Sequence, residues 1–176
     1  MDNNLELVKY DDPILKEKAY AITELTPEVY KLGRDMIKFM YENNGIGLAA
    51  PQIGLPIRMF TMHMFTEENK EVEQGSEIDS GQAVIIINPK LVSGEGEVTF
   101  EEGCLSYPGV SIPVKRYEKI IMSSASLHDG EYGETTLTGI NAICAQHEMD
   151  HLDGITFLDK LPRNQRRAIL RKLQKK

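Results

Sequence analysis

Hydrophobic positions follow a helical period near both ends of the chain and a strand-like period between them. Thr26 and Pro27 supply a helix start, and apolar residues then recur at helical spacing until about residue 43. We therefore predict a helix over residues 26–43, with one apolar face formed by Leu32, Met36, Ile37 and Met40.

The middle of the chain consists of short runs of apolar and β-branched residues separated by turn-forming residues. These runs predict strands over residues 57–62, 83–87, 97–100, 120–126 and 135–137. A second helical pattern begins near Gly139 and ends near Gly154, where a glycine often closes a helix. A third helix is predicted over residues 162–176, with apolar positions at Leu161, Ile169, Leu170 and Leu173.

The order of these elements predicts the fold class. Strands dominate the middle, helices lie at both ends, and one helix passes through the core, which argues against alternating strand–helix units. We expect an α+β fold in which antiparallel or mixed β-sheets pack around the central helix. Residues 66–82 are acidic, contain Gly and Ser, and are predicted to form a surface loop.

The predicted central helix carries the most specific chemistry of the chain. Its segment His147-Glu148-Met149-Asp150-His151 has the form His-Glu-x-x-His, which places two imidazoles on one helical face where they can bind one metal ion. Glu148 can act as a general base for a water that such a metal activates. Apolar residues at the same spacing extend this face, so we expect the histidines to be buried.

A catalytic metal site built on two histidines needs a third protein ligand. No Glu follows Glu148, which argues against zinc proteases of the thermolysin type. The metzincin pattern fails as well, because Phe157 stands where its third histidine would be.

The remaining candidates for the third ligand are Cys104, Cys144, His63 and His128. Cys144 lies on the order of 10 Å along the helix from His151, so we predict a buried wall residue there. His63 and His128 fit strand-end or surface positions better. Cys104 follows Gly103, which permits close backbone approach, and is the best candidate.

Three motifs, in this order, show a resemblance to the bacterial peptide deformylases, and the similarity extends over most of the chain. The motifs are Gly45-Ile46-Gly47-Leu48-Ala49-Ala50-Pro51-Gln52, Glu102-Gly103-Cys104-Leu105-Ser106 and Gln146-His147-Glu148-Met149-Asp150-His151. The resemblance implies a metal-dependent hydrolase that removes the N-terminal formyl group from the formylmethionine of nascent polypeptides and releases formate.

The resemblance also implies how the site is built. Cys104, His147 and His151 would hold one divalent metal, Fe(II) in the cell, although Zn(II), Ni(II) or Co(II) also suit these ligands. Glu148 would carry the proton. The side-chain amide of Gln52 and the backbone N–H of Leu105 would stabilise the negative oxygen of the tetrahedral intermediate.

For the substrate, the resemblance implies an extended peptide bound main chain to main chain beside Gly45, Gly47 and Gly103. The walls of the methionine pocket would be Ile46, Phe100, Ile140, Ile143 and Cys144. Glu102 and Arg116 would form an ion pair that orients the metal ligands. The chain departs from many relatives in its long loop over residues 66–82 and in Ser111, which stands where many have an arginine.

Two other classes of protein share these residues. A closed structural metal site, with His63 or His128 as a fourth ligand, would indicate a binding protein. Such a site has no use for Glu148 or Gln52. A metalloprotease acting on internal peptide bonds is disfavoured by the missing downstream ligand.

The bulk properties favour one catalytic domain over residues 1–176, with 41% hydrophobic residues. The polar start, the absence of a long apolar run and only two cysteines predict a cytoplasmic protein without membrane or DNA partners. The net charge is −7, yet residues 160–176 carry eight basic side chains and no acidic one. The predicted C-terminal helix, residues 162–176, is therefore a candidate for docking on ribosomal RNA.

Overall fold

The computed structural model describes residues 5–66, 82–127 and 129–174, and it confirms the α+β class. The elements in chain order are η1 (Pro13–Lys16), α1 (Pro27–Glu42), β1 (Gly47–Ala49), η2 (Ala50–Ile53), β2 (Met59–His63), β3 (Ala83–Glu95), β4 (Val98–Gly103), β5 (Ser111–Arg116), β6 (Lys119–Ala125), β7 (Tyr132–Thr138), α2 (Gly139–Leu152), η4 (Phe157–Lys160) and α3 (Arg163–Leu173). None of the helices in these ranges is long and apolar enough to cross a bilayer. The predicted loop over residues 66–82 falls almost wholly outside the described residues.

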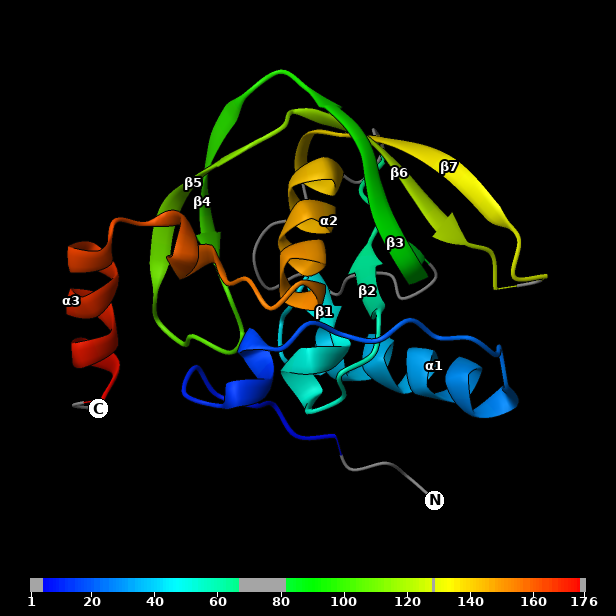
Figure 1. Cartoon of the computed structure of the whole chain (residues 1–176), viewed down its shortest axis with the longest axis horizontal. Coiled ribbons are helices and arrows are strands. Elements are labelled where there is room, and N and C mark those ends of the chain that lie inside the picture. Colours follow the sequence, from blue (N-terminus) through cyan, green and yellow to red (C-terminus); the bar gives the residue numbers. More distant parts are fainter. Residues whose placement is uncertain (1–4, 67–81, 128, 175–176) are drawn as a thin grey trace.

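The strands form two sheets that flank α2. The larger has five strands in the order β1-β2-β3-β6-β7, and the smaller pairs β4 with β5. Every neighbouring pair in both sheets is antiparallel. Figure 1 shows α2 running through the middle of the molecule, with β4 and β5 on one side and the larger sheet on the other.

All five predicted strands exist, but their extent differs and two more strands are present. Strand β3 continues past Pro89 to Glu95 because a bulge, with Asn88 at a φ of 49°, absorbs the irregularity. Strand β5 was not predicted because it contains Pro113, a residue that interrupts interior strands. A proline is tolerated there because, among the described strands, β5 pairs with β4 alone and has a free edge. The unpredicted β1 has only three residues.

Helix α2 differs from the expected one-sided amphipathic helix. Its residues from Ala142 to Met149 are all buried, so the helix is surrounded by protein rather than lying on a surface. One side packs on the larger sheet through a cluster that includes Phe60, Ile120 and Ala145. The helix ends as predicted near Gly154, whose φ of 69° is favourable only for glycine.

Helix α1 covers the opposite face of the larger sheet through Met36 and Met40, which are fully buried. Ile37 was expected on the same face, but it is only half-buried and lies outside this cluster. Its position is one residue past Met36, which turns it about 100° around the helix.

Asp159 in η4 ties the C-terminal helix to the start of the chain. Its carboxylate accepts hydrogen bonds from Lys16 in η1, from both the backbone and the hydroxyl of Thr156, and from Arg166 in α3. Burial raises the pKa of Asp159, but the bonds from Lys16 and Thr156 outweigh it and lower the pKa to about 2. The ionised carboxylate therefore stabilises the folded state.

We expect the Asp159→Asn variant to lose about 1–2 kcal/mol of unfolding free energy at pH 7, after allowance for solvent screening. A lowered carboxyl pKa contributes stability above the unfolded value of 3.8 and loses it as the pH falls toward 2. Urea unfolding of both proteins should therefore show a difference that disappears near pH 2. The control is Glu97→Gln, whose exposed pair with Lys115 should contribute little. A loss that is independent of pH would contradict the assignment.

Candidate active site

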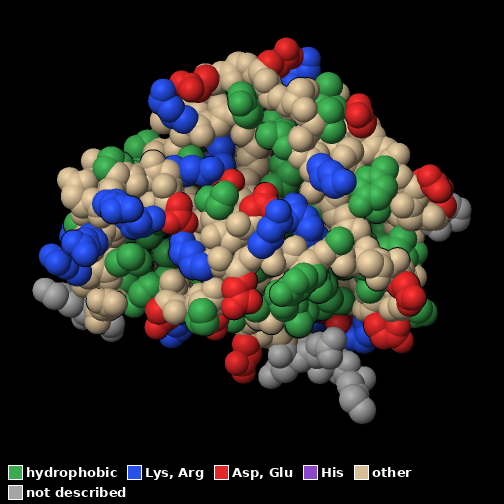
Figure 2. Space-filling model, in the orientation of Figure 1, with side chains coloured by type: hydrophobic (Ala, Val, Ile, Leu, Met, Phe, Trp, Pro, Cys, Tyr) green, Lys and Arg blue, Asp and Glu red, His purple; other side chains and the backbone are tan. Residues whose placement is uncertain are grey.

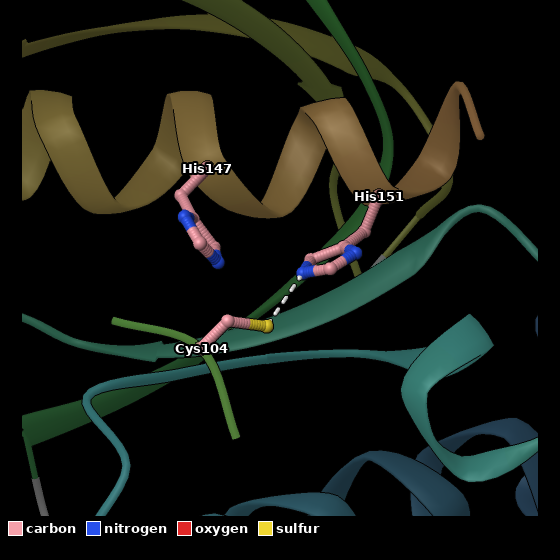
Figure 3. Close-up of side chains that lie close together, drawn as sticks. All are labelled: Cys104, His147 and His151. Atoms are coloured by element: carbon pink, nitrogen blue, oxygen red, sulfur yellow. Dashed lines mark hydrogen bonds between the residues drawn. The ribbon is translucent and has the colours of Figure 1, made fainter. Parts of the chain in front are cut away.

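Three side chains from two distant segments converge beside α2. Cys104 directly follows β4, while His147 and His151 project from the same face of α2 (Figure 3). One ligand atom from each residue lies within 4.8 Å of the others, and Cys104 Sγ is 3.3 Å from His151 Nε2. Donor atoms that share one metal ion, through bonds of about 2.0–2.3 Å, lie as close to one another as these three do. The predicted ligands are therefore brought together.

A buried ion pair orients the first histidine. His147 Nδ1 is 2.9 Å from Glu102 Oε2, and Arg116 contacts both oxygens of Glu102 at 2.6 and 2.9 Å. Burial raises the pKa of Glu102, but the hydrogen bonds from Arg116 and His147 outweigh it and lower the pKa to about 2. An ionised Glu102 accepts the Nδ1 proton, so Nε2 of His147 faces the other ligands.

The electrostatic environment of the three side chains favours the binding of a cation. Burial lowers the pKa of His147, but its interactions with Cys104 and Glu102 outweigh this effect and raise the pKa well above its ordinary value. Burial lowers the pKa of His151 well below its ordinary value, which keeps that imidazole neutral. Its Nδ1 is buried without a hydrogen-bond partner in the described protein. One thiol and two imidazoles in this setting fit a divalent metal ion.

Glu148 lies next to these ligands with one carboxylate oxygen, Oε2, buried and unpaired within the described residues. Burial raises its pKa to about 7. A carboxyl group with a pKa near neutrality can both accept and return a proton. Gly47 of β1 makes room for this group, because a Cβ at position 47 would collide with Glu148 Oε1 and lie 2.7 Å from Cys144 Sγ.

Two candidate donors lie beside the site, one in η2 and one in the segment after Cys104. The backbone N–H of Ala49 donates to Gln52 Oε1 at 2.8 Å, which turns the amide nitrogen of Gln52 toward Cys104 Sγ, 3.4 Å away. The backbone N–H of Leu105 has no acceptor among the described residues. Both groups can therefore donate to a negatively charged oxygen in the cleft.

A cleft of about 1060 Å³ opens beside these groups. It is lined by every residue predicted to contact substrate, namely Gly45, Ile46, Gly47, Phe100, Gly103, Ile140, Ile143 and Cys144. Phe100 remains 39% exposed and forms part of the rim. The cleft also contains residues that the sequence did not single out, including Tyr41, Glu42, Phe65, Glu101, Tyr107 and Val110. They belong to no motif, and only the folded chain brings them together.

The other ligand candidates lie apart from the three donors. His63 is buried in β2, where Nδ1 is 3.0 Å from the Tyr41 hydroxyl and the ring packs on Phe65. Cys144 donates to the carbonyl of Ile46 at 3.5 Å and lines the cleft, as predicted. His128 lies outside the described residues. Within the described chain, the cluster of possible metal ligands thus has three members and opens onto a cleft.

This arrangement of thiol, imidazoles, buried carboxyl and open cleft defines a metal-dependent hydrolase. Residues 4–167 match the sequence profile of the polypeptide deformylases. A peptide deformylase from Aquifex aeolicus is 40% identical over 170 residues, covering 97% of this chain and 95% of that protein. One from Thermodesulfovibrio yellowstonii is 38% identical over 172 residues, covering 98% of each chain.

Solved structures agree with the sequence relatives. A peptide deformylase from Ehrlichia chaffeensis superposes with a TM-score of 0.84 at 32% identity, covering 97% of this chain and 95% of that one. One from Legionella pneumophila gives a TM-score of 0.81 at 34% identity, with 97% and 94% covered. The chain belongs to the polypeptide deformylase family. It is a metallohydrolase that removes the formyl group from nascent peptides, and a closed structural metal site is not favoured.

Replacing Glu102 with Gln should weaken metal binding, because a neutral amide holds the Nδ1 proton of His147 less firmly than a carboxylate does. We expect the affinity for Co(II) to fall about 10–100-fold, measured by competition with a chelator, while circular dichroism reports a folded protein. The control is Glu95→Gln, which removes an exposed carboxylate paired with Lys119. Equal affinities for all three proteins would show that Glu102 does not orient the ligand.

Proposed function

We propose that Cys104, His147 and His151 hold one divalent metal ion and that the cleft receives the formylated end of a nascent chain. The observation that carries this proposal is the convergence of three donor atoms beside an open cleft, which Cys104 and His147 line. When bound, the ion lowers the pKa of water and supplies hydroxide near neutral pH. Fe(II) is the ion we propose for the cell, and Zn(II), Ni(II) or Co(II) suit the same donors.

Glu148 moves the proton in this proposal. Its carboxylate accepts a proton from the attacking water and passes it to the amine that leaves. Burial supports this role, because it raises the carboxyl pKa to about 7 and keeps bulk water away from the transferred proton.

Gln52 and Leu105 hold the charge that develops on the formyl oxygen. The Gln52 amide is fixed in advance by its bond to Ala49, so little reorganisation is needed when the charge forms. The Leu105 N–H approaches from the chain segment that follows Cys104. Donors from two elements thus face the same oxygen.

The peptide binds in an extended form between two strand edges. Strand β1 pairs only with β2 and β4 only with β5 among the described strands, so each keeps an edge for main-chain bonding. Main-chain contacts do not distinguish side chains, which suits an enzyme that acts on many sequences. The methionine side chain occupies the apolar pocket formed by Ile46, Phe100, Ile140, Ile143 and Cys144.

Formate release from formyl-Met-Ala tests the reaction and the proton carrier together. We expect the metal-loaded wild type to release formate, and Glu148→Gln to be slower by about 10²–10⁴-fold in kcat, because the amide cannot accept the proton. The metal content of both proteins is measured in parallel. Activity of the variant equal to that of the wild type would remove Glu148 from the reaction, and no release by the wild type would refute the hydrolase.

We further propose that residues 1–176 form one catalytic domain, with residues 162–176 as a basic segment that docks on ribosomal RNA in the cytoplasm. Helix α3 packs on the body through Ile169, Leu170 and Leu173. This packing leaves four basic side chains exposed, namely Arg163, Arg167, Arg171 and Lys172. Lys and Arg side chains gather at this end of the face shown in Figure 2. A cytoplasmic location suits a cysteine ligand, which requires a reducing compartment.

Weak, salt-sensitive binding to ribosomes should depend on the exposed cations of α3. The test variant carries Gln at Arg163, Arg167, Arg171 and Lys172. The control carries Gln at Lys9, Lys18, Lys38 and Lys119, which changes the net charge equally. Sedimentation with ribosomes should show about tenfold weaker binding for the first variant alone, with a shallower dependence on salt. Equal binding by both variants would exclude α3 as the docking element.

A further inference from the structure

The guanidinium of Arg116 binds two carboxylates at once. Its Nε and Nη2 donate to Glu102 at 2.6 and 2.9 Å, and its Nη1 donates to Asp150 Oδ2 at 2.6 Å. Burial lowers the pKa of Arg116, but the hydrogen bond to Glu102 and the charge of Asp150 outweigh it and raise the pKa above its ordinary value. One buried positive charge therefore faces two negative ones. Glu102 holds His147, whereas Asp150 has no role in the proposed reaction.

Asp150 lies outside the substrate cleft. It lines a second cavity, of about 620 Å³, together with Arg116 and Lys160. Within the described chain, the two cavities share no lining residue. Asp150 is three residues past His147 on α2, so the two side chains are neighbours on the helix surface but line different cavities. Any effect of Asp150 on the reaction must therefore pass through the protein rather than through contact with substrate.

A continuous chain of charged contacts joins Asp150 to a metal ligand. Asp150 holds Arg116, Arg116 holds both oxygens of Glu102, and Glu102 Oε2 lies 2.9 Å from His147 Nδ1. The side chains of Arg116 and Glu102 are each 4% exposed and that of Asp150 is 17% exposed, so solvent screens these contacts little. Without the charge of Asp150, Arg116 would neutralise Glu102 more completely, and Glu102 would bind the Nδ1 proton less strongly.

We propose that Asp150 is a positioning residue for the metal centre. By sharing Arg116 with Glu102, it keeps Glu102 negative and fixed in place, and Glu102 in turn keeps His147 turned toward the ion. The inference rests on the proposed role of His147 as a metal ligand. Lys160 also contacts Asp150, at 3.0 Å, but its side chain is 38% exposed and compensates the carboxylate only in part.

The affinity for Co(II), measured by competition with a chelator, tests this role. Asp150→Asn removes the charge but keeps an oxygen that can accept from Arg116, so the fold should be retained. We expect a loss of about three- to tenfold, smaller than that for a direct partner of a ligand. Asp150→Glu keeps the charge, has room in the cavity, and should restore most of the affinity. The matched control is Asp153→Asn, which removes an equal charge from the same cavity, where Asp153 pairs with Arg58 instead, and should bind as the wild type does.

A second readout follows the His147 ring in the metal-free protein. Proton NMR should show its Nδ1 proton protected from exchange with water in the wild type and in Asp153→Asn. The exchange should be faster in Asp150→Asn, because Glu102 holds this proton less firmly. A general loss of packing would not single out this proton, so unchanged exchange in Asp150→Asn would contradict the inference.

Lys160→Gln separates the path through Arg116 from a general need for ion pairs at Asp150. It removes one cation from Asp150 but leaves the contacts to His147 intact, so the affinity for Co(II) should stay within about twofold. A loss as large as that of Asp150→Asn would overturn the inference.

Two outcomes of the affinity measurement distinguish this inference from the proposed function. If the wild type binds Co(II) and Asp150→Asn binds it equally well, the inference is wrong and the proposed metal site stands. If the wild type does not bind Co(II), the proposed metal site itself fails, and the role of Asp150 fails with it.

Discussion

The structure depends on burying a helix that carries polar side chains. Gln146, His147, Glu148 and His151 all lie on α2 inside the protein, and each buried polar group needs a partner. Gln146 finds its partners in the backbone of Tyr117 and Ala142. His147 is bound by Glu102. Within the described residues, Glu148 Oε2 and His151 Nδ1 have no hydrogen-bond partner. His151 faces Cys104 with Nε2, so a metal ion bound by the cluster would partner that nitrogen.

The two sheets bury α2 but leave its metal-ligand cluster accessible from the cleft. The larger sheet closes one side of α2, and the β4–β5 hairpin closes the other while bringing Cys104 and Glu102 to the helix. Among the described strands, β1 and β4 each keep an unpaired edge, and both contribute residues to the cleft lining. In the proposed function, a substrate bound along those edges is held by its backbone, and the apolar pocket selects its methionine side chain. General binding and limited selectivity thus come from different parts of the same cleft.

The sequence predicted those parts of the site that depend on local spacing. The face shared by His147 and His151 follows from helical geometry, and the pairing of Glu102 with Arg116 followed from family resemblance. Strand β5 was missed because Pro113 interrupts its strand-like pattern. The edge position that makes this proline acceptable is visible only in the assembled sheet. The burial of α2 on all sides was also missed. The spacing of hydrophobic residues reveals one apolar face of a helix, but not how many neighbouring elements cover its other faces.

X-ray absorption spectroscopy of the Co(II)- or Zn(II)-loaded protein tests the central claim most directly. The account predicts one sulfur at about 2.3 Å and two imidazole nitrogens at about 2.0–2.1 Å, with the remaining position filled by an exchangeable oxygen. Loss of the sulfur signal in Cys104→Ser would confirm its source. A site without sulfur, or one with a fourth protein ligand in place of the exchangeable oxygen, would contradict the account.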